Sequence, residues 1–326
     1  MNQTLIINKK EAEALLTFED AIKAMREVFA AISQGDAIML QREMIKHENG
    51  NALAVMPASM KDKGITGSKI IIFPGKETRK AGTNQGVFPL FSIDTGALLA
   101  ITDAEAMTVI RTAAASALAT DILALKEASS LCILGTGKQG LAHAEAICLV
   151  RNIKNIYLWN KNHDTGRAAV KRFQEKLAIP ITYFENSEDA VKNADIICTT
   201  SKAHEPILLG KDIKEGAHIN AVGACSSKIR EIDTEVLKRA KVFCDKKEAC
   251  FKDAGDLLIP LEKGEIHKDI VIGEIGQIIL GESQGRTSNV EITLFESVGL
   301  SVQDLASAWL IYEKALKSGH GIKVEL

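Results

Sequence analysis

Three basic residues near the start of the chain are of types that bind carboxylates and move protons. Arg42 and Arg111 carry planar guanidinium groups, which stay charged and hold a carboxylate through two parallel hydrogen bonds. Burial of Lys69 beside arginines would lower the pKa of its ammonium group and let it donate a proton. From the residues alone, Arg42 could equally be a solvated strand residue, and Arg111 could pair with Asp103 or Glu105.

A glycine-rich turn follows the apolar strand expected at 131–134. The turn reads Gly135-Thr136-Gly137-Lys138-Gln139-Gly140, and a helix is expected to begin within it, which is the context that a dinucleotide-binding turn requires. Gly135 permits the tight turn, Gly137 lets the backbone approach a pyrophosphate, and Gly140 lets helix and strand pack closely. The exposed amides and the helix dipole favour the diphosphate. The alternative is a strand–helix turn that happens to be rich in glycine.

The end of the second strand of this unit bears on the choice of dinucleotide. Asn160 lies about twenty residues after Gly140, where an acidic residue would hold the ribose hydroxyls of NAD, and Lys161 follows it. A carboxylate would repel a 2′-phosphate, whereas an amide and a cation accept one. The sequence therefore favours NADP(H) over NAD(H). The alternative is a solvated Lys161 and an enzyme that uses either cofactor.

The elements expected before residue 130 form a first group. A short strand is expected at 4–7 and an amphipathic helix at 17–34, which Thr17 caps and Gly35 ends. Short β-type runs then follow one another without helices between them, which predicts an antiparallel sheet. An alanine-rich helix follows at about 103–125. The β-type runs are 39–45, 52–56, 65–73, 87–93 and 97–102.

From residue 130 the pattern alternates between strands and helices. Apolar strands separated by helices predict a parallel sheet covered on both faces. We therefore expect an α/β protein with a Rossmann dinucleotide-binding domain. A last helix at 302–318 is expected to return to the first domain and make it discontinuous. The strands are expected at 131–134, 156–159, 181–184, 196–199, 218–222 and 242–244, with helices at about 139–150, 163–177 and 187–194.

Composition narrows the class of protein. The formal net charge is −2 and aromatic residues make up 5% of the 326 residues, with Lys and Arg scattered, so we expect no nucleic-acid partner. The six cysteines form no CxxC pair, which predicts reduced thiols and no disulfide or zinc site. The N-terminus does not resemble a signal peptide, and no apolar run approaches the ~18 residues of a membrane span. We expect a cytoplasmic protein with no membrane partner.

Five segments, in this order and spacing, resemble the ornithine cyclodeaminase/mu-crystallin family over nearly the whole chain. The Arg-Thr-Ala segment that precedes the glycine turn by about twenty residues is the most specific of them. The segments are 67–70 (Gly-Ser-Lys-Ile), 111–119 (Arg-Thr-Ala-Ala-Ala-Ser-Ala-Leu-Ala), 135–140, 230–233 (Arg-Glu-Ile-Asp) and 293–299 (Thr-Leu-Phe-Glu-Ser-Val-Gly).

This resemblance implies a homodimer that acts on the carbon–nitrogen bond of a small amino or imino acid. It implies a discontinuous α+β substrate and dimerisation domain, 1–122 completed by about 300–326, and a Rossmann domain at 123–299. Residues matching Arg42, Lys69 and Arg111 hold the substrate carboxylate in the family, and those matching Thr83 and Arg111 lie near the nicotinamide. The expected cofactor contacts are the glycine turn, including Gln139, together with Asn160, Lys161, Thr199, Ser201, Val222 and Gly223.

Two departures separate this chain from the cyclodeaminases of the family. Those enzymes carry carboxylates at positions matching Ala54 and Cys225, and cyclodeamination needs such an acid/base to manage a second amino group. The local sequence is more similar to the mu-crystallin branch, which resembles ketimine reductases that use NADPH. Cys225 is interpreted as a spacer, His143 and His204 as structural or solvated, and Asp233 and Asp304 as helix caps.

The leading prediction is an NAD(P)H-dependent reductase of the C=N bond of a small, cyclic imino acid such as pyrroline-2-carboxylate. Arg42 and Arg111 would clamp the carboxylate, and Lys69 would supply the proton. The first alternative is ornithine cyclodeaminase, a lyase, or an amino-acid dehydrogenase such as alanine dehydrogenase. The second is a ligand-binding protein that keeps the cofactor and does little catalysis.

Overall fold

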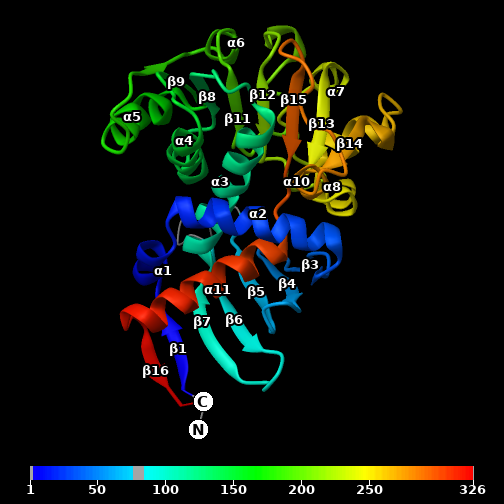
Figure 1. Ribbon diagram of the computed structural model, residues 1–326. Helices are drawn as coiled ribbons and strands as arrows, with labels where there is room; N and C mark the ends of the chain where they lie inside the picture. The colour runs from blue at the N-terminus through cyan, green and yellow to red at the C-terminus, as the bar shows by residue number, and fades with distance from the viewer. Residues whose placement is uncertain (1–2, 76–83, 326) are drawn as a thin grey trace. The chain divides into compact units, whose positions relative to one another are not determined.

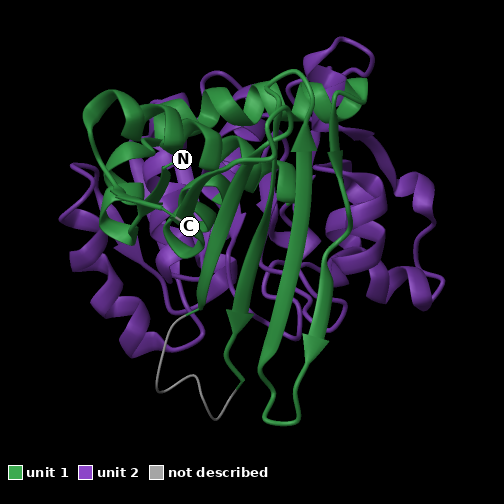
Figure 2. Cartoon of the chain, turned by 90° about the horizontal axis from the view of Figure 1, so that it is seen from below, with its two compact units in different colours: residues 1–112, 300–326 green, residues 113–299 purple. Residues whose placement is uncertain are grey.

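The computed structural model describes residues 3–75 and 84–325 (Figure 1). The chain divides into two compact units, which Figure 2 colours separately. Unit 1 is residues 1–112 with 300–326, and unit 2 is residues 113–299. The first unit is thus discontinuous, and the division falls inside helix α3 (Ala104–Leu123), the helix that also contains the boundary predicted at residue 122.

Unit 1 contains a mixed eight-stranded sheet whose strands come from both ends of the chain. Its strands are β1 (Thr4–Ile7), β2 (Ala37–Met39), β3 (Glu43–Lys46), β4 (Ala52–Met60), β5 (Ile65–Phe73), β6 (Gln85–Ser92), β7 (Leu98–Asp103) and β16 (Ile322–Val324). The order across the sheet is β16-β1-β7-β6-β5-β4-β2, and β3 also pairs with β4. The antiparallel pairing predicted for 39–103 is confirmed from β2 to β7, whereas β1 joins β7 in parallel.

Two long helices cover one face of this sheet. They are α2 (Phe18–Gln34) and α11 (Ser301–Ser318), with the short α1 (Lys9–Leu15) beside them (Figure 1). Thr17 caps α2 and Gly35 ends it in a left-handed conformation, as the sequence predicts. Residues of β5 alternate between the covered face and the opposite face, and Lys69 follows the register of the buried positions. A cation is therefore placed among core residues.

Unit 2 contains an eight-stranded sheet in which every pairing is parallel. Its strands are β8 (Ser130–Leu134), β9 (Asn155–Trp159), β10 (Ile181–Tyr183), β11 (Ile196–Thr199), β12 (His218–Ala221), β13 (Ala240–Cys244), β14 (Val271–Glu274) and β15 (Ile292–Glu296). The order is β10-β9-β8-β11-β12-β15-β13-β14. The direction of winding reverses between β8 and β11, so the sheet has the switch point at which Rossmann-type domains bind ligands.

The helices of unit 2 lead into or link these parallel strands. They are the second half of α3, α4 (Lys138–Val150), α5 (His163–Gln174), α6 (Ser187–Val191), α7 (Thr234–Arg239), α8 (Lys247–Asp253), α9 (Gly255–Glu262) and α10 (Ile275–Ile279). The central strands β8, β11, β12 and β15 are buried at every residue, which is the signature of a sheet covered on both faces. The predicted α/β class and Rossmann-type unit are confirmed.

At several places the local structure differs from the sequence-based predictions. The run predicted at 39–45 is broken into β2 and β3, which both pair with β4, and Arg42 lies in the irregular segment between them. Strand β15 was not predicted, although it lies between β12 and β13 in the sheet. No apolar run of membrane-spanning length was predicted, but helix α3 is long and apolar enough to cross a bilayer. Of its most apolar stretch, 67% is buried within the structure, as in the core helix of a globular protein.

Candidate active site

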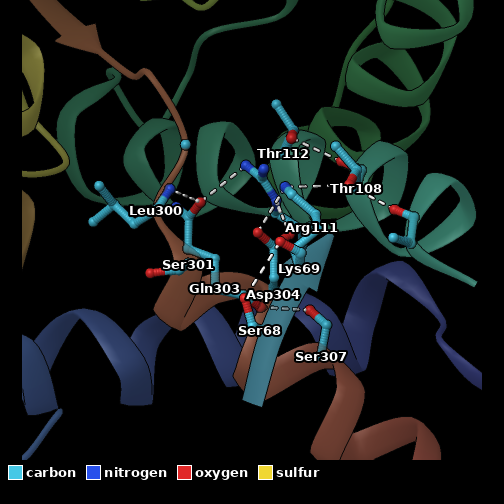
Figure 3. Close-up of polar contacts among 12 residues, drawn as sticks. Ser68, Lys69, Thr108, Arg111, Thr112, Leu300, Ser301, Gln303, Asp304 and Ser307 are labelled. Carbon is cyan, nitrogen blue, oxygen red and sulfur yellow. Dashed lines mark hydrogen bonds and ion pairs between the residues drawn. The ribbon is translucent and has the colours of Figure 1, made fainter. Parts of the chain in front are cut away.

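Unit 1 brings Lys69 and Arg111 together on one buried carboxylate, that of Asp304 (Figure 3). Lys69 Nζ lies 2.7 Å from Asp304 Oδ2, and Arg111 Nε donates to Asp304 Oδ1 at 2.9 Å. The three residues come from β5, α3 and α11, and none is more than 4% exposed. The structure thus places two of the three predicted substrate-binding cations side by side, away from bulk water.

The electrostatics of this cluster favour a mobile proton on Lys69. Burial lowers the pKa of its ammonium group to about 8; the carboxylate of Asp304 opposes that shift, while the charges of Arg111 and Arg42 reinforce it. Burial would raise the pKa of the Asp304 carboxyl, but Arg111 and Lys69 outweigh it, so that pKa lies below its ordinary value. Asp304 is therefore ionised at neutral pH, and Lys69 can exchange a proton there.

Gln303 completes the buried cluster. Its Oε1 accepts from Arg111 Nη1 at 3.0 Å and from the backbone amide of Leu300 at 2.9 Å, which holds the first turn of α11. The Gln303 Nε2 donor is buried and has no hydrogen-bond acceptor among the described residues. A buried amide donor left in this way suits an anionic ligand, because an unmet donor is costly to bury.

The third predicted substrate residue, Arg42, and the residue predicted near the nicotinamide, Thr83, are placed less directly. Arg42 lies in the irregular segment between β2 and β3, half-buried, and its positive charge contributes to the lowered pKa of Lys69. Thr83 lies outside the described residues. Thr108, one turn before Arg111 on α3, was not predicted, and its Oγ1 accepts from Lys69 Nζ at 3.5 Å.

The interpretation of Asp304 as a helix cap is wrong. Asp304 follows Gln303 in the first turn of α11 and is fully buried against Lys69 and Arg111, whereas the residue that precedes the helix is Leu300. Asp233 does cap α7, since its side chain accepts from the backbone amide of Val236. The one sequence signal for Asp304 was an acidic residue among apolar neighbours on the inward side of α11.

In unit 2 the glycine turn joins β8 to α4. Gly135 has a φ of +108°, which only glycine adopts readily, and a Cβ on Gly140 would lie 2.2 Å from Gly135 O. The space beside Gly137 is open, with nothing within 4 Å of an added Cβ. The turn is therefore tight where it must pack and open where a phosphate would approach.

The turn also has unmet hydrogen-bonding capacity that fits a dinucleotide. Thr136 Oγ1 and Gln139 Oε1 are buried and lack a hydrogen-bond partner within the described part of the chain. No side chain in the described part of the chain caps the N-terminus of the 13-residue helix α4, so its first amides and its dipole face the turn. These features suit the pyrophosphate and ribose of a bound dinucleotide.

Residues at the end of β9 surround the position expected for the ribose. Asn160 Oδ1 accepts from the amide of Thr136 at 3.3 Å, and Lys161 is exposed beside it. Arg172, an exposed residue of α5 that the sequence did not single out, donates to the carbonyl of Thr136. An amide, followed by Lys161, therefore stands where NAD-selective domains carry a carboxylate, and the guanidinium group of Arg172 lies at the glycine turn.

The remaining predicted cofactor residues lie at the end of β11 and in the loops that follow β11 and β12. Thr199 and Val222 are buried, whereas Ser201 and Gly223 are partly exposed. Thr200, between Thr199 and Ser201, donates from its amide to Leu134 O at 2.9 Å and from its Oγ1 to Gly135 O at 2.8 Å. The loop after β11 is thus bonded to the glycine turn across the switch point of the sheet.

The other reactive side chains are structural or solvated. His143 is buried in α4 between Gln139 O and Ser116 Oγ, and burial lowers the pKa of its imidazole to about 4, so the ring is neutral. His204 contacts Lys228 O at the surface, and Cys225 is exposed. Among the described residues, no group of three or more histidine, cysteine or acidic side chains is arranged to hold a metal ion.

Comparison with known proteins finds one protein family that matches both units of this chain. The family model of the ornithine cyclodeaminase/mu-crystallin family matches residues 2–319. The chain is 35% identical to the Delta(1)-pyrroline-2-carboxylate reductase of Bacillus cereus over 98% of this chain and 99% of that one. The structure of Thermococcus litoralis Delta(1)-pyrroline-2-carboxylate reductase in complex with NADH and L-proline superimposes with a TM-score of 0.95, at 32% identity over 98% of this chain and 100% of that one. An archaeal alanine dehydrogenase dimer with bound NAD follows at a TM-score of 0.94 and 31% identity, with both chains fully covered.

Proposed function

Because this chain belongs to the ornithine cyclodeaminase/mu-crystallin family, we propose that it is an NAD(P)H-dependent reductase of a small imino acid. The substrate is a C=N compound bearing a carboxylate, with cyclic pyrroline-2-carboxylate as the first candidate. The observation that carries the proposal is the buried Lys69–Asp304–Arg111 cluster. In this cluster Arg111, a cation suited to binding a carboxylate, and the titratable ammonium group of Lys69 contact the same carboxylate.

Arg111 and Lys69 have distinct roles in this reaction. Arg111 is fixed through Nε and Nη1 by Asp304 and Gln303, and its remaining guanidinium donors are left to bind the substrate carboxylate. A carboxylate held in this way fixes the C=N group for reaction. The bound nicotinamide supplies the hydride. Lys69, whose pKa is about 8, supplies the proton that makes the imine nitrogen cationic and the adjacent carbon a better acceptor.

The test is oxidation of reduced nicotinamide coenzyme by the purified protein in the presence of pyrroline-2-carboxylate. We expect turnover with the wild type and its loss in Lys69→Met, while the variant still binds the coenzyme by fluorescence titration. Unchanged turnover in Lys69→Met would remove Lys69 from the mechanism. No turnover by the wild type with a panel of small imino acids would favour a protein that binds the cofactor and does little catalysis.

We propose that the coenzyme is NADP(H) in preference to NAD(H). The support is the absence of a carboxylate at Asn160 together with the cations of Lys161 and Arg172 near the same turn. The solved relatives named above hold NADH or NAD. Binding of a nicotinamide dinucleotide is therefore expected in either case, and the preference depends on whether the site accepts a 2′-phosphate. We expect a lower KM for NADPH than for NADH. Equal values would mean an enzyme that uses both.

We also propose that the protein is a homodimer joined through unit 1. On the sheet face opposite Lys69, Val55, Ile70 and Val87 are cross-strand neighbours, and Ile70 and Val87 are 37% and 43% exposed. A row of aliphatic side chains across adjacent strands is suited to burial against a second copy. Val87→Lys is expected to shift the sedimentation coefficient from dimer to monomer. Val290→Lys, at an exposed valine of unit 2, is the matched control and should leave it unchanged.

Oxidative deamination of an amino acid is the second candidate, because the archaeal alanine dehydrogenase superimposes almost as well. In the reverse direction, reductive amination, the same buried cluster would hold the carboxylate of a 2-oxo acid, and ammonia would supply the nitrogen. Coenzyme oxidation with pyruvate and ammonia, measured beside the pyrroline-2-carboxylate assay, separates the two activities. A higher kcat/KM with pyruvate and ammonia would make this the main reaction.

A further inference from the structure

We propose that Glu231 is a positioning residue for cofactor binding, which acts by clamping together the loops that follow β11 and β12. The inference rests on the proposed function, because Ser201 and Gly223 of these loops are expected cofactor contacts. Glu231 itself is fully buried and has no direct role in the chemistry described above. Its segment, 230–233, contributes to the family resemblance, but no function had been assigned to it.

The carboxylate of Glu231 accepts one backbone amide from each loop. Oε1 accepts from Ser201 N at 2.5 Å, and Oε2 accepts from Gly223 N at 2.7 Å. The fit is close, since a Cβ on Gly223 would lie 2.3 Å from Glu231 Oε2 and 2.2 Å from Ser201 O. Two oxygens of a single planar group therefore fix the separation of the two loops.

The clamp extends to the glycine turn. An added Cβ on Gly135 would lie within 3.0 Å of Thr200 O and Ser201 N, so the turn packs directly on the residue that Glu231 holds. Thr200 completes the contact by donating from Oγ1 to Gly135 O. Displacement of Ser201 would consequently be transmitted to the turn that is expected to bind the pyrophosphate.

A second buried acid, Asp256, holds the backbone of Glu231 in place. Asp256, near the start of α9, accepts from the amides of Glu231 and Ile232 at 2.7 and 3.1 Å through its Oδ1. These bonds fix the backbone of the segment from which the Glu231 side chain extends. Hydrogen bonds from backbone amides to these two buried carboxylates thus fix the positions of loops that have no regular secondary structure.

The charge state of the clamp is sensitive to pH near neutrality. Burial raises the pKa of the Glu231 carboxyl to about 7, while its bonds to the Ser201 and Gly223 loops oppose the shift. The charged groups facing it are Asp256, whose pKa burial and Glu231 raise to about 8, and Glu296 of β15, whose pKa is also raised by burial and by the neighbouring acids. Arg230 opposes the shift at Asp256. Only ionised Glu231 accepts both amides fully, so protonation loosens the clamp.

The test measures the dissociation constant of NADH, which has no 2′-phosphate to titrate, by fluorescence between about pH 6 and pH 8. For the wild type we expect binding to weaken as the pH falls through about 7. In Glu231→Gln one acceptor becomes an amide donor facing a backbone N–H, so we expect about tenfold weaker binding at pH 8 and a flatter pH profile. Asp233→Asn is the matched control, because Asp233 also accepts two backbone amides, Gly210 N and Val236 N, but holds neither cofactor loop.

The outcomes separate this inference from the proposed function. If the wild type binds neither NADH nor NADPH, the proposed function fails. If the wild type binds but Glu231→Gln, folded by circular dichroism, has the wild-type dissociation constant and pH profile, only the clamp is refuted. Equal losses of affinity in Glu231→Gln and Asp233→Asn would also refute it, because they would indicate general destabilisation. If Glu231→Gln does not fold, the wild-type profile decides, and a flat one refutes the clamp.

Discussion

Replacement of Asp304 by Asn tests the assignment of Lys69 as the proton donor. The substitution keeps the size of the side chain and removes the negative charge that lies 2.7 Å from Lys69 Nζ and 2.9 Å from Arg111 Nε. Both cations then remain buried without their carboxylate. Since an ammonium group loses its proton more readily when an opposite charge is removed, the pKa of Lys69 must fall.

The size of the effect follows from the present pKa of Lys69, about 8. An opposite charge at this range shifts a pKa by about 1–3 units, so the value in the variant falls to roughly 5–7. At pH 7 the protonated fraction of Lys69 then drops from about nine-tenths to between roughly one-hundredth and one-half. If Lys69 supplies the proton, kcat/KM at pH 7 falls by about 2- to 100-fold and recovers as the pH is lowered.

The assay is the pH dependence of kcat/KM for reduction of pyrroline-2-carboxylate. The wild type should lose activity as the pH rises through about 8, and Asp304→Asn should lose it at lower pH. Asp103→Asn is the control, because Asp103 accepts the amide of Ala106 at the start of α3 and does not contact Lys69. An Asp304→Asn profile with its alkaline limb in the wild-type position would refute the assignment, whatever the loss of overall rate.

Three further substitutions test the rest of the site. Arg111→Lys removes the planar fork and should lower kcat/KM by roughly 10- to 100-fold, mainly through KM for the imino acid, as steady-state kinetics would reveal. Gly140→Ala places a Cβ 2.2 Å from Gly135 O, so denaturant unfolding should show a loss of about 1–3 kcal/mol, together with weaker coenzyme binding in a fluorescence titration. Arg172→Ala should raise KM for NADPH while leaving KM for NADH unchanged; equal changes would exclude a contact with the 2′-phosphate.

The sequence predicts most of the fold, because the order of strand-like and helix-like segments differs between the two units. Consecutive strands without helices predicted the antiparallel sheet of unit 1, and apolar strands separated by helices predicted the parallel sheet of unit 2. Burial agrees with both, since it alternates along β5 and is continuous along β8. Strand order was not predictable in the same way. Strand β15 inserts between β12 and β13, although β13 precedes it in the chain, and this order depends on tertiary packing that no local pattern encodes.

Only part of the site was predicted, because some of its contacts also depend on tertiary packing. Residues with a motif around them, such as Lys69, Arg111 and the glycine turn, were singled out from sequence. An acid near the start of a helix commonly caps it, so the local sequence predicts a cap at Asp304. Its partners lie 235 and 193 residues earlier in the chain, and pairing over such separations follows from the fold and not from spacing.

The charges of the buried cluster lead to a last prediction about the substrate. Lys69 and Arg111 bring two positive charges and Asp304 brings one negative charge. A substrate carboxylate would supply a second negative charge, favour the protonated form of Lys69 and so retain the proton until the imine receives it. Unsubstituted 1-pyrroline has the same ring and C=N bond without the carboxylate. We expect its kcat/KM to be at least about 100-fold lower than that of pyrroline-2-carboxylate. Comparable values for the two imines would mean that the cluster serves the fold and takes no part in recognition.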